Sequence, residues 1–168
     1  MELIEAIMSR TSAARLREPG PSAAHLEVML AAADRAPDHG RLKPWRVQVL
    51  DQAARIRLGE AALAARRRRD PQAPEDALRM EREKYLRSPC LVLVGCVIRR
   101  DQPKVPEVEQ LLAAGAAVQN LCLAAHALGY GAMWKTGPAA YEPEVKQAVG
   151  LAPQDHLVAI LHLGTRDH

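Results

Sequence analysis

The sequence predicts an α+β fold. The continuous apolar run at 91–98 is typical of a central strand that is covered on both faces. The Ala-rich segment at about 107–128 has apolar residues at helical spacing. The other helical and strand-like segments are mixed without strict alternation, which favours α+β over a doubly wound α/β sheet.

The first part of the chain is expected to form two helices and a strand. Apolar residues within 3–8 share one face of a short opening helix. Ser22 can cap a second helix, which must end near Arg35 because Pro37 disfavours the helical conformation of the residue before it. Residues 45–50 alternate between apolar and polar, as a strand does.

Two further helices are expected before the apolar strand. Residues 52–68 form the first, and the arginines at 66–69 suit the negative end of its dipole. A loop and a second, strongly charged helix then lead to about Arg87. The segment 99–106 contains two prolines and is expected to be an exposed loop.

The helix at about 107–128 should be the longest, with Gly129 ending it. Its middle, residues 113–117, consists only of Ala and Gly, so the backbone of another helix could approach it closely. This close approach suggests a partner subunit. After it, residues 132–134 and 157–163 are expected to be strands and residues 141–149 a short helix.

Length and composition limit the class of protein. With 168 residues, 48% of them hydrophobic, the chain is expected to form one domain, 1–168. No apolar run approaches the roughly 20 residues of a membrane helix, and the start does not resemble a signal peptide. The formal charge of +3 is not a broad basic field, so a nucleic-acid-binding module is poorly supported. Cys90, Cys96 and Cys122 show no CxxC or zinc spacing, which favours a cytoplasmic protein without a metal site.

Three polar clusters could bind a ligand. In Arg10-Thr11-Ser12 a guanidinium and a hydroxyl could face one phosphate, although solvated arginines at a helix end are the simpler alternative. The loop at 35–45 holds charged side chains and two prolines between a helix and a strand, where binding groups are common; an ordinary connection is the alternative. Trp45 in this loop is expected in the core. The strand at 132–134 runs into Lys135 and Thr136, where a ligand or only a turn could lie.

Taken together and in this order, these segments resemble the flavin-dependent nitroreductase family, in particular its short YdjA-type NAD(P)H nitroreductases. The resemblance spans nearly the whole chain and rests on 10–12, 35–45, 134–137 and 161–165. It implies a nitroreductase-like fold with a central mixed or antiparallel sheet flanked by helices. It also implies an interlocked homodimer with FMN in clefts at the subunit interface.

The resemblance also implies roles for residues of the first two clusters. Arg10, Thr11 and Ser12 match the family segment that binds the FMN phosphate and ribityl chain. Arg35 and His39 match positions that reach the FMN held mainly by the other subunit.

For the third cluster, the resemblance places Trp134, Lys135 and Thr136 on the strand beside the isoalloxazine ring. Larger members often carry a basic residue two positions after the serine, and it is absent here. The positive charge near flavin N1 is therefore expected from Lys43, Arg41 or Lys135.

The activity implied is that of an FMN-dependent NAD(P)H oxidoreductase. Hydride passes from NAD(P)H through flavin N5 to a nitroaromatic, a quinone or another small-molecule acceptor. The segment 124–129 matches the stretch assigned to NAD(P)H in short members. Because the flavin carries the chemistry, no catalytic side chain is expected, with Lys135 as a candidate for tuning the flavin. A flavin-binding protein with little turnover of its own is the alternative.

Overall fold

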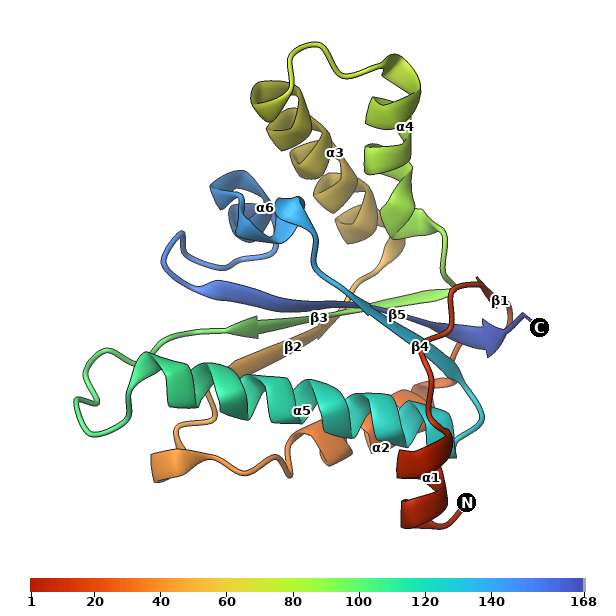
Figure 1. The fold of residues 1–168 in the computed structure, drawn as a ribbon, viewed down its shortest axis with the longest axis vertical. Helices are drawn as coiled ribbons and strands as arrows, with labels where there is room; N and C mark the ends of the chain where they lie inside the picture. Colours follow the sequence, from red (N-terminus) through yellow and green to blue (C-terminus); the bar gives the residue numbers. More distant parts are fainter. Residues whose placement is uncertain (168) are drawn as a thin grey trace.

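The computed structural model describes residues 1–167 and contains a five-stranded antiparallel sheet with helices on both faces (Figure 1). This confirms the α+β prediction and selects the antiparallel sheet of the two types expected. The strands are β1 (Leu16–Arg17), β2 (Trp45–Val49), β3 (Cys90–Cys96), β4 (Gly131–Lys135) and β5 (His156–Arg166). The α-helices are α1 (Leu3–Ser9), α2 (Ala23–Ala33), α3 (Gln52–Arg69), α4 (Glu75–Glu83), α5 (Glu107–Ala127) and α6 (Pro143–Ala148).

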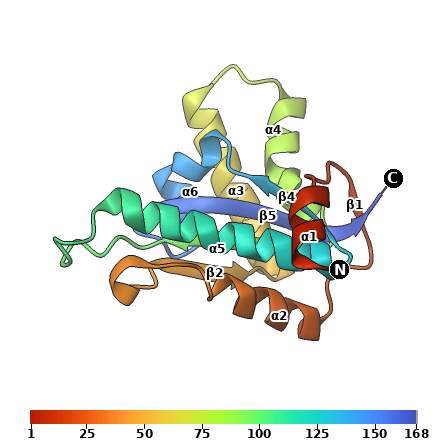
Figure 2. The same ribbon diagram turned by 60° about the horizontal axis from the view of Figure 1, so that its bottom comes forward.

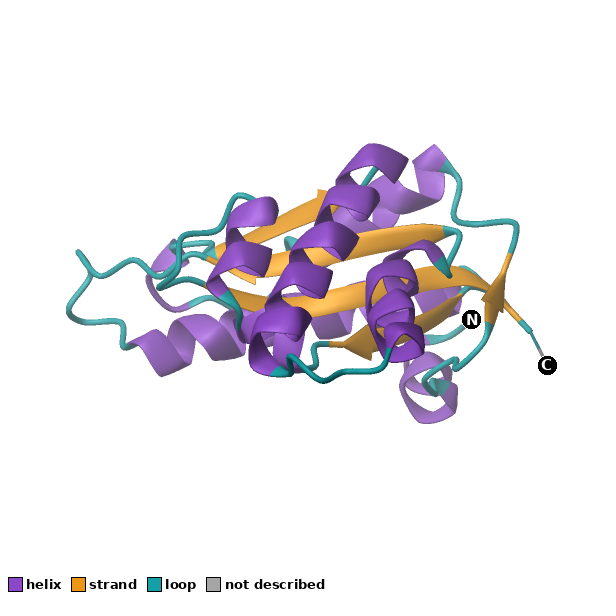
Figure 3. Cartoon of the chain, turned by 90° about the horizontal axis from the view of Figure 1, so that it is seen from above, coloured by secondary structure: helices purple, strands orange, loops and turns teal. Residues whose placement is uncertain are grey.

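The helices form a layer on each face of the sheet. Helices α2 and α5 pack together on one face, and α1 lies beside the C-terminal end of α5 (Figures 1 and 2). Helices α3, α4 and α6 cover the other face, which is turned toward the viewer in Figure 3. Both faces of the central strands are therefore shielded from water.

Strand β5 is the centre of the sheet. It pairs with β3, β4 and β1, and β2 completes the sheet beyond β3. Leu161, for example, lies opposite Val92 of β3 and Trp134 of β4. The start of β4 thus lies near the start of β3, because Ala132 of β4 and Cys90 of β3 are both opposite Leu163 of β5.

Local sequence signals account for several helix ends. The Ser22 hydroxyl accepts a hydrogen bond of 3.2 Å from the His25 N–H at the start of α2, which is the N-cap expected. Asp51 caps α3 in the same way, with its carboxylate 2.7 Å from the Ala54 nitrogen. After α5, Gly129 has φ of 87°, a left-handed conformation that favours glycine.

Several boundaries differ from the prediction. Strand β1 was not expected, because two residues are too few to show a periodic pattern. The charged helix ends at Glu83, and residues 84–86 form a tighter 3-10 turn. The helix expected at 141–149 is the shorter α6, which follows a 3-10 turn at Pro138–Tyr141. Strand β5 extends beyond both ends of the predicted 157–163.

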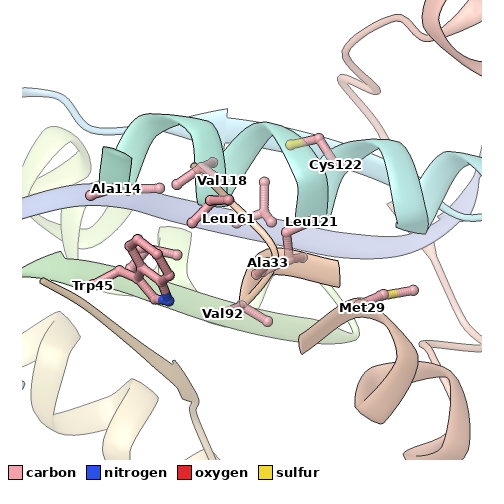
Figure 4. Close-up of a cluster of buried hydrophobic side chains, with 14 of the residues drawn as sticks. Met29, Ala33, Trp45, Val92, Ala114, Val118, Leu121, Cys122 and Leu161 are labelled. Atoms are coloured by element: carbon pink, nitrogen blue, oxygen red, sulfur yellow. The ribbon is translucent and has the colours of Figure 1, made fainter. Parts of the chain in front are cut away.

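Each face of the sheet has its own apolar core. Alternate residues of β3 point to opposite sides: Val92 packs toward α2 and α5, and Leu91 packs toward α3 and α6. Figure 4 shows the first core, where Leu121 of α5 lies among side chains of α2 and the sheet. Trp45 belongs to this core, as expected.

Helix α5 is long and apolar enough to cross a membrane, by length and composition alone, which differs from the expectation that no such segment exists. In this fold its inner side packs on α2 and the sheet, and residues such as Ala117 and Val118 are fully buried. Its outer side exposes Val108 and Leu112. We therefore interpret α5 as a core helix with one uncovered apolar side.

Candidate functional site

A cleft of about 360 Å³ lies at the end of β4. Its walls come from the segment between α1 and β1, from the turn and loop between α4 and β3, and from β4 and β5. The lining residues are Ala13, Ala14, Leu16, Lys84, Tyr85, Arg87, Ser88, Met133, Lys135, Thr136, Gly137, Ile160 and His162. The volume is within the range of about 300–1,000 Å³ that is typical of small-molecule sites.

The charged side chains that line the cleft are basic. Lys84, Arg87 and Lys135 contribute cations, and no carboxylate is among the lining residues within 1–167. Lys84 is the only one of the three with an ion pair in the described chain, to Glu81 at 2.7 Å. The cleft therefore suits a ligand with anionic groups or several carbonyl oxygens.

The buried pair Ser88 and His162 forms one wall of the cleft. The Ser88 hydroxyl lies 2.9 Å from His162 Nδ1 and donates its hydrogen to the Cys90 carbonyl at 3.0 Å. Because a hydroxyl has one hydrogen to donate, Nδ1 must be the donor in the Ser88–His162 bond. This bond fixes the imidazole as the Nδ1–H tautomer and leaves Nε2 without a hydrogen.

Burial lowers the pKa of His162 to about 4, and the positive charges of Lys135, Arg55 and Lys84 act in the same direction. The imidazole is therefore neutral at physiological pH. Its two nitrogens then have different roles, one as donor to Ser88 and one as acceptor.

Arg55 of α3 holds the loop that carries Ser88. Its guanidinium donates to the carbonyl oxygens of Tyr85 at 2.7 Å and Pro89 at 3.3 Å, and also to that of Ser88. Burial lowers the pKa of Arg55. The guanidinium still donates hydrogen bonds to three carbonyl oxygens that lie close together in space. Arg55 thus positions the wall of the cleft without lining it.

The first predicted cluster borders the cleft but does not line it. Arg10 ends α1, and Thr11 and Ser12 are exposed, followed by Ala13 and Ala14 in the cleft wall. Two contacts anchor this segment. The Ala13 N–H donates to the Ala132 carbonyl of β4 at 3.0 Å, and the Arg166 guanidinium donates to the Thr11 hydroxyl at 2.9 Å and carbonyl at 2.8 Å.

The second predicted cluster lies elsewhere in the chain. Arg35 is exposed after α2, and His39 Nδ1 is 2.5 Å from the Glu109 carboxylate at the start of α5. Lys43 pairs with Asp34 at 2.5 Å, a contact that lowers the pKa of that carboxyl group. Arg41, beside Lys43, is exposed as well. None of these side chains lines the cleft.

Arg10 of the first cluster and His39 of the second lie near opposite ends of α5. Ser9, beside Arg10, contacts His126 near the C-terminal end at 2.8 Å, whereas His39 contacts Glu109 near the other end. At 1.5 Å per residue, these two contact points are about 25 Å apart along the helix. One chain therefore does not bring Arg10 and His39 to one small ligand.

The third predicted cluster is divided. Lys135 and Thr136 line the cleft, but Trp134 does not. The indole N–H of Trp134 donates to the Val158 carbonyl at 3.0 Å, and the residue is 40% exposed. The segment 124–129, matched to NAD(P)H, forms the end of α5 and does not line the cleft.

Sequence reasoning missed five polar lining residues, Lys84, Tyr85, Arg87, Ser88 and His162. The first four follow α4, which ends at Glu83 although the charged helix was expected to continue to about residue 87. A signal for the fifth was available, because a histidine between Leu161 and Leu163 in an apolar strand needs a hydrogen-bond partner when buried.

Comparison with known proteins identifies the family. The model of the nitroreductase family matches residues 7–165. "Putative NAD(P)H nitroreductase YdjA" of Escherichia coli (strain K12) is 35% identical over 169 residues, which cover 98% of this chain and 88% of that protein. The crystal structure of a nitroreductase-like family protein from Bacillus cereus has a TM-score of 0.79 at 25% identity and covers 100% of this chain and 87% of its own. A nitroreductase with bound FMN from Bacteroides fragilis NCTC 9343 has a TM-score of 0.75 at 21% identity, and the match covers 99% of this chain and 89% of that one. The resemblance found in the sequence is thus confirmed, and the chain belongs to the nitroreductase family.

Proposed function

We propose that this protein is an FMN-dependent NAD(P)H oxidoreductase that reduces a nitroaromatic, a quinone or another small acceptor. The observation that carries the proposal is the basic cleft at the end of β4, bordered by the Arg10-Thr11-Ser12 segment. The E. coli relative is named an NAD(P)H nitroreductase, and the B. fragilis relative holds FMN. Family membership and the cleft together support the same chemistry here.

The residues around the cleft fit FMN. Arg10 and the exposed hydroxyls of Thr11 and Ser12 provide a charge and donors for a phosphate. The cleft offers cations for the carbonyl-rich end of a flavin ring. Tyr85, which lines it, has a buried hydroxyl without a hydrogen-bond partner in residues 1–167. Such a group is commonly satisfied by a ligand or by water.

The site would be completed by a second copy of the chain. Arg35 and His39 would act on the FMN bound mainly by the partner, which agrees with the separation of about 25 Å along α5 between the His39 contact and the Ser9 contact. The exposed apolar side chains of α1 and α5 are also ones that a homodimer would cover, with exposed fractions of 59% to 81%: Leu3, Ile4 and Met8 of α1 and Val108 and Leu112 of α5.

When bound, FMN would supply the hydride chemistry between NAD(P)H and the acceptor. The chain itself would bind and orient the ligands. Arg10, Thr11 and Ser12 would hold the phosphate. Lys135 would place a positive charge in the cleft where negative charge develops, and Thr136 would help to fix the ring position. Trp134, whose side chain does not line the cleft, would lie beside the ring through its place on the same strand.

We further propose that residues 1–168 form a single domain that works in the cytoplasm. Both apolar cores share the one sheet, so no part of the chain has a separate core. Cys90, Cys96 and Cys122 are free and buried. Burial raises the pKa of each thiol, so all three are protonated and unreactive at neutral pH.

The test is to purify the protein, record its visible spectrum and identify any flavin that heating releases. NAD(P)H oxidation with and without a nitroaromatic or a quinone then measures turnover. We expect released FMN and acceptor-dependent oxidation, which Arg10→Ala decreases and the control Arg57→Ala does not. A protein that binds FMN but does not oxidise NAD(P)H would be a flavin-binding protein, and one that binds no FMN would contradict the proposal.

A further inference from the structure

His162 presents an unused hydrogen-bond acceptor to the cleft. Nδ1 is bonded to Ser88, and Nε2 has no hydrogen-bond partner in residues 1–167. Because His162 lines the cleft, Nε2 is the part of the imidazole that remains for a ligand. A buried neutral acceptor of this kind selects ligands with an N–H or O–H group, because a ligand without one leaves it unpaired.

The neighbouring groups narrow the choice of ligand. Lys84 and Lys135 line the same cleft and can only donate hydrogen bonds. An acceptor that shares a cleft with donors complements a ligand edge that has both an N–H and carbonyl oxygens. An imide has this arrangement, and the pyrimidine end of the isoalloxazine ring carries one, formed by C2=O, N3–H and C4=O.

We propose that His162 determines the ligand specificity of the cleft by accepting a hydrogen bond at Nε2 from the imide N–H of the bound ring. This inference rests on the proposed function, in which the ring is FMN and the donor is its N3–H. Ser88 is then a positioning residue, because its bond to Nδ1 keeps the hydrogen away from Nε2.

The protonation state that the proposal requires can be tested without flavin. The two neutral tautomers differ in the nitrogen chemical shifts of the imidazole, so NMR of ¹⁵N-histidine protein identifies which nitrogen carries the hydrogen. We expect the His162 signal, assigned by its loss in His162→Gln, to show a bare Nε2 at pH 7. A hydrogen on Nε2 would overturn the proposal.

The ligand contact is tested with two flavins and two variants. An asparagine at 162 can replace Nδ1 but is too short to place an acceptor at the position of Nε2, whereas a glutamine can reach it. His162→Asn should bind FMN about three- to tenfold more weakly than wild type, the loss of one neutral hydrogen bond, and His162→Gln should recover part of that loss.

N3-methyl-FMN lacks the imide hydrogen and is the matched probe. The wild-type protein should prefer FMN over N3-methyl-FMN by at least about tenfold, because methylation removes the bond and leaves Nε2 unpaired. In folded His162→Asn, checked by circular dichroism, this preference should fall to about threefold or less. Equal preferences in the two proteins would overturn the role of His162 while leaving FMN binding intact. If the wild type bound neither flavin, the proposed function itself would be contradicted.

Discussion

Replacing Arg55 with methionine should destabilise the loop that forms one wall of the cleft. The change removes the guanidinium, which bonds the carbonyls of Tyr85, Ser88 and Pro89, and keeps a side chain of similar length. A hydrogen bond to a charged group contributes about 1.5–3 kcal/mol. Water can reach part of this half-buried site, so we expect a loss of roughly 2–4 kcal/mol rather than the full sum for three bonds.

Urea unfolding of Arg55→Met and Arg57→Met at equal protein concentration measures this effect. Arg57 is a matched control, since it lies on α3 and is exposed, and its side chain has no hydrogen bond or ion pair to residues 1–167. Only the Arg55 variant should lose stability and, because the loop carries Arg87 and Ser88, also FMN affinity. The reasoning would be refuted if the unfolding free energies of the two variants agreed within about 0.5 kcal/mol.

Other outcomes are expected from the same structure. Lys135→Ala should lower the midpoint potential of bound FMN, by about 30 mV for each 1.4 kcal/mol by which Lys135 stabilises the reduced flavin. An unchanged potential in spectroelectrochemistry would mean that the side chain does not act on the ring. Arg10→Ala should weaken FMN binding at least about tenfold in fluorescence titrations, and equal affinity would exclude a phosphate contact. Mixed dimers of one Arg10→Ala chain and one Arg35→Ala chain should keep about half of the activity if Arg35 acts across the interface, because one of the two sites then carries neither change. Light scattering that gave only an 18.4 kDa monomer would rule out a site shared between two subunits. The pKa of His162 lies at about 4, below its usual 6.5, so the unfolded chain takes up the proton first as the pH falls. The contribution of neutral His162 to the free energy of unfolding is therefore complete above pH 6.5 and is lost as the pH falls toward 4, by up to about 3 kcal/mol. In urea unfolding, the free energy of unfolding of His162→Gln should decrease less than that of the wild type over this pH range.

The helices and strands whose buried residues recur at a regular spacing could be predicted from the sequence. The continuous apolar run predicts β3, and apolar residues at helical spacing predict α5, and both are found in the structure. The ends of α2 and α5 also follow from local signals at Ser22 and Gly129. Strand β1 could not be predicted, because its two residues are extended only through pairing with Thr165 and Arg166, far away in the sequence.

The site was predictable only where it is local in sequence. Lys135 and Thr136 stand out because a strand meets a turn there, and both line the cleft. Ser88 and His162 are 74 residues apart, and their roles depend on the pairing of β3 with β5 and on the buried bond between them. The role of Arg35 could not be derived from local sequence either, because its proposed ligand would be bound mainly by another copy of the chain.

The position of β5 in the sheet has a consequence for synthesis of the protein. The ribosome synthesises β5 after the other four strands, yet β3, β4 and β1 all pair with it. Until β5 emerges, a nascent chain has only the β2–β3 pair of its sheet, and the strand that ends at Lys135 has no partner. A stop codon near residue 155 would keep the other four strands but remove β5, and would leave the sheet in separate pieces. Such a product should be recognised as misfolded and degraded.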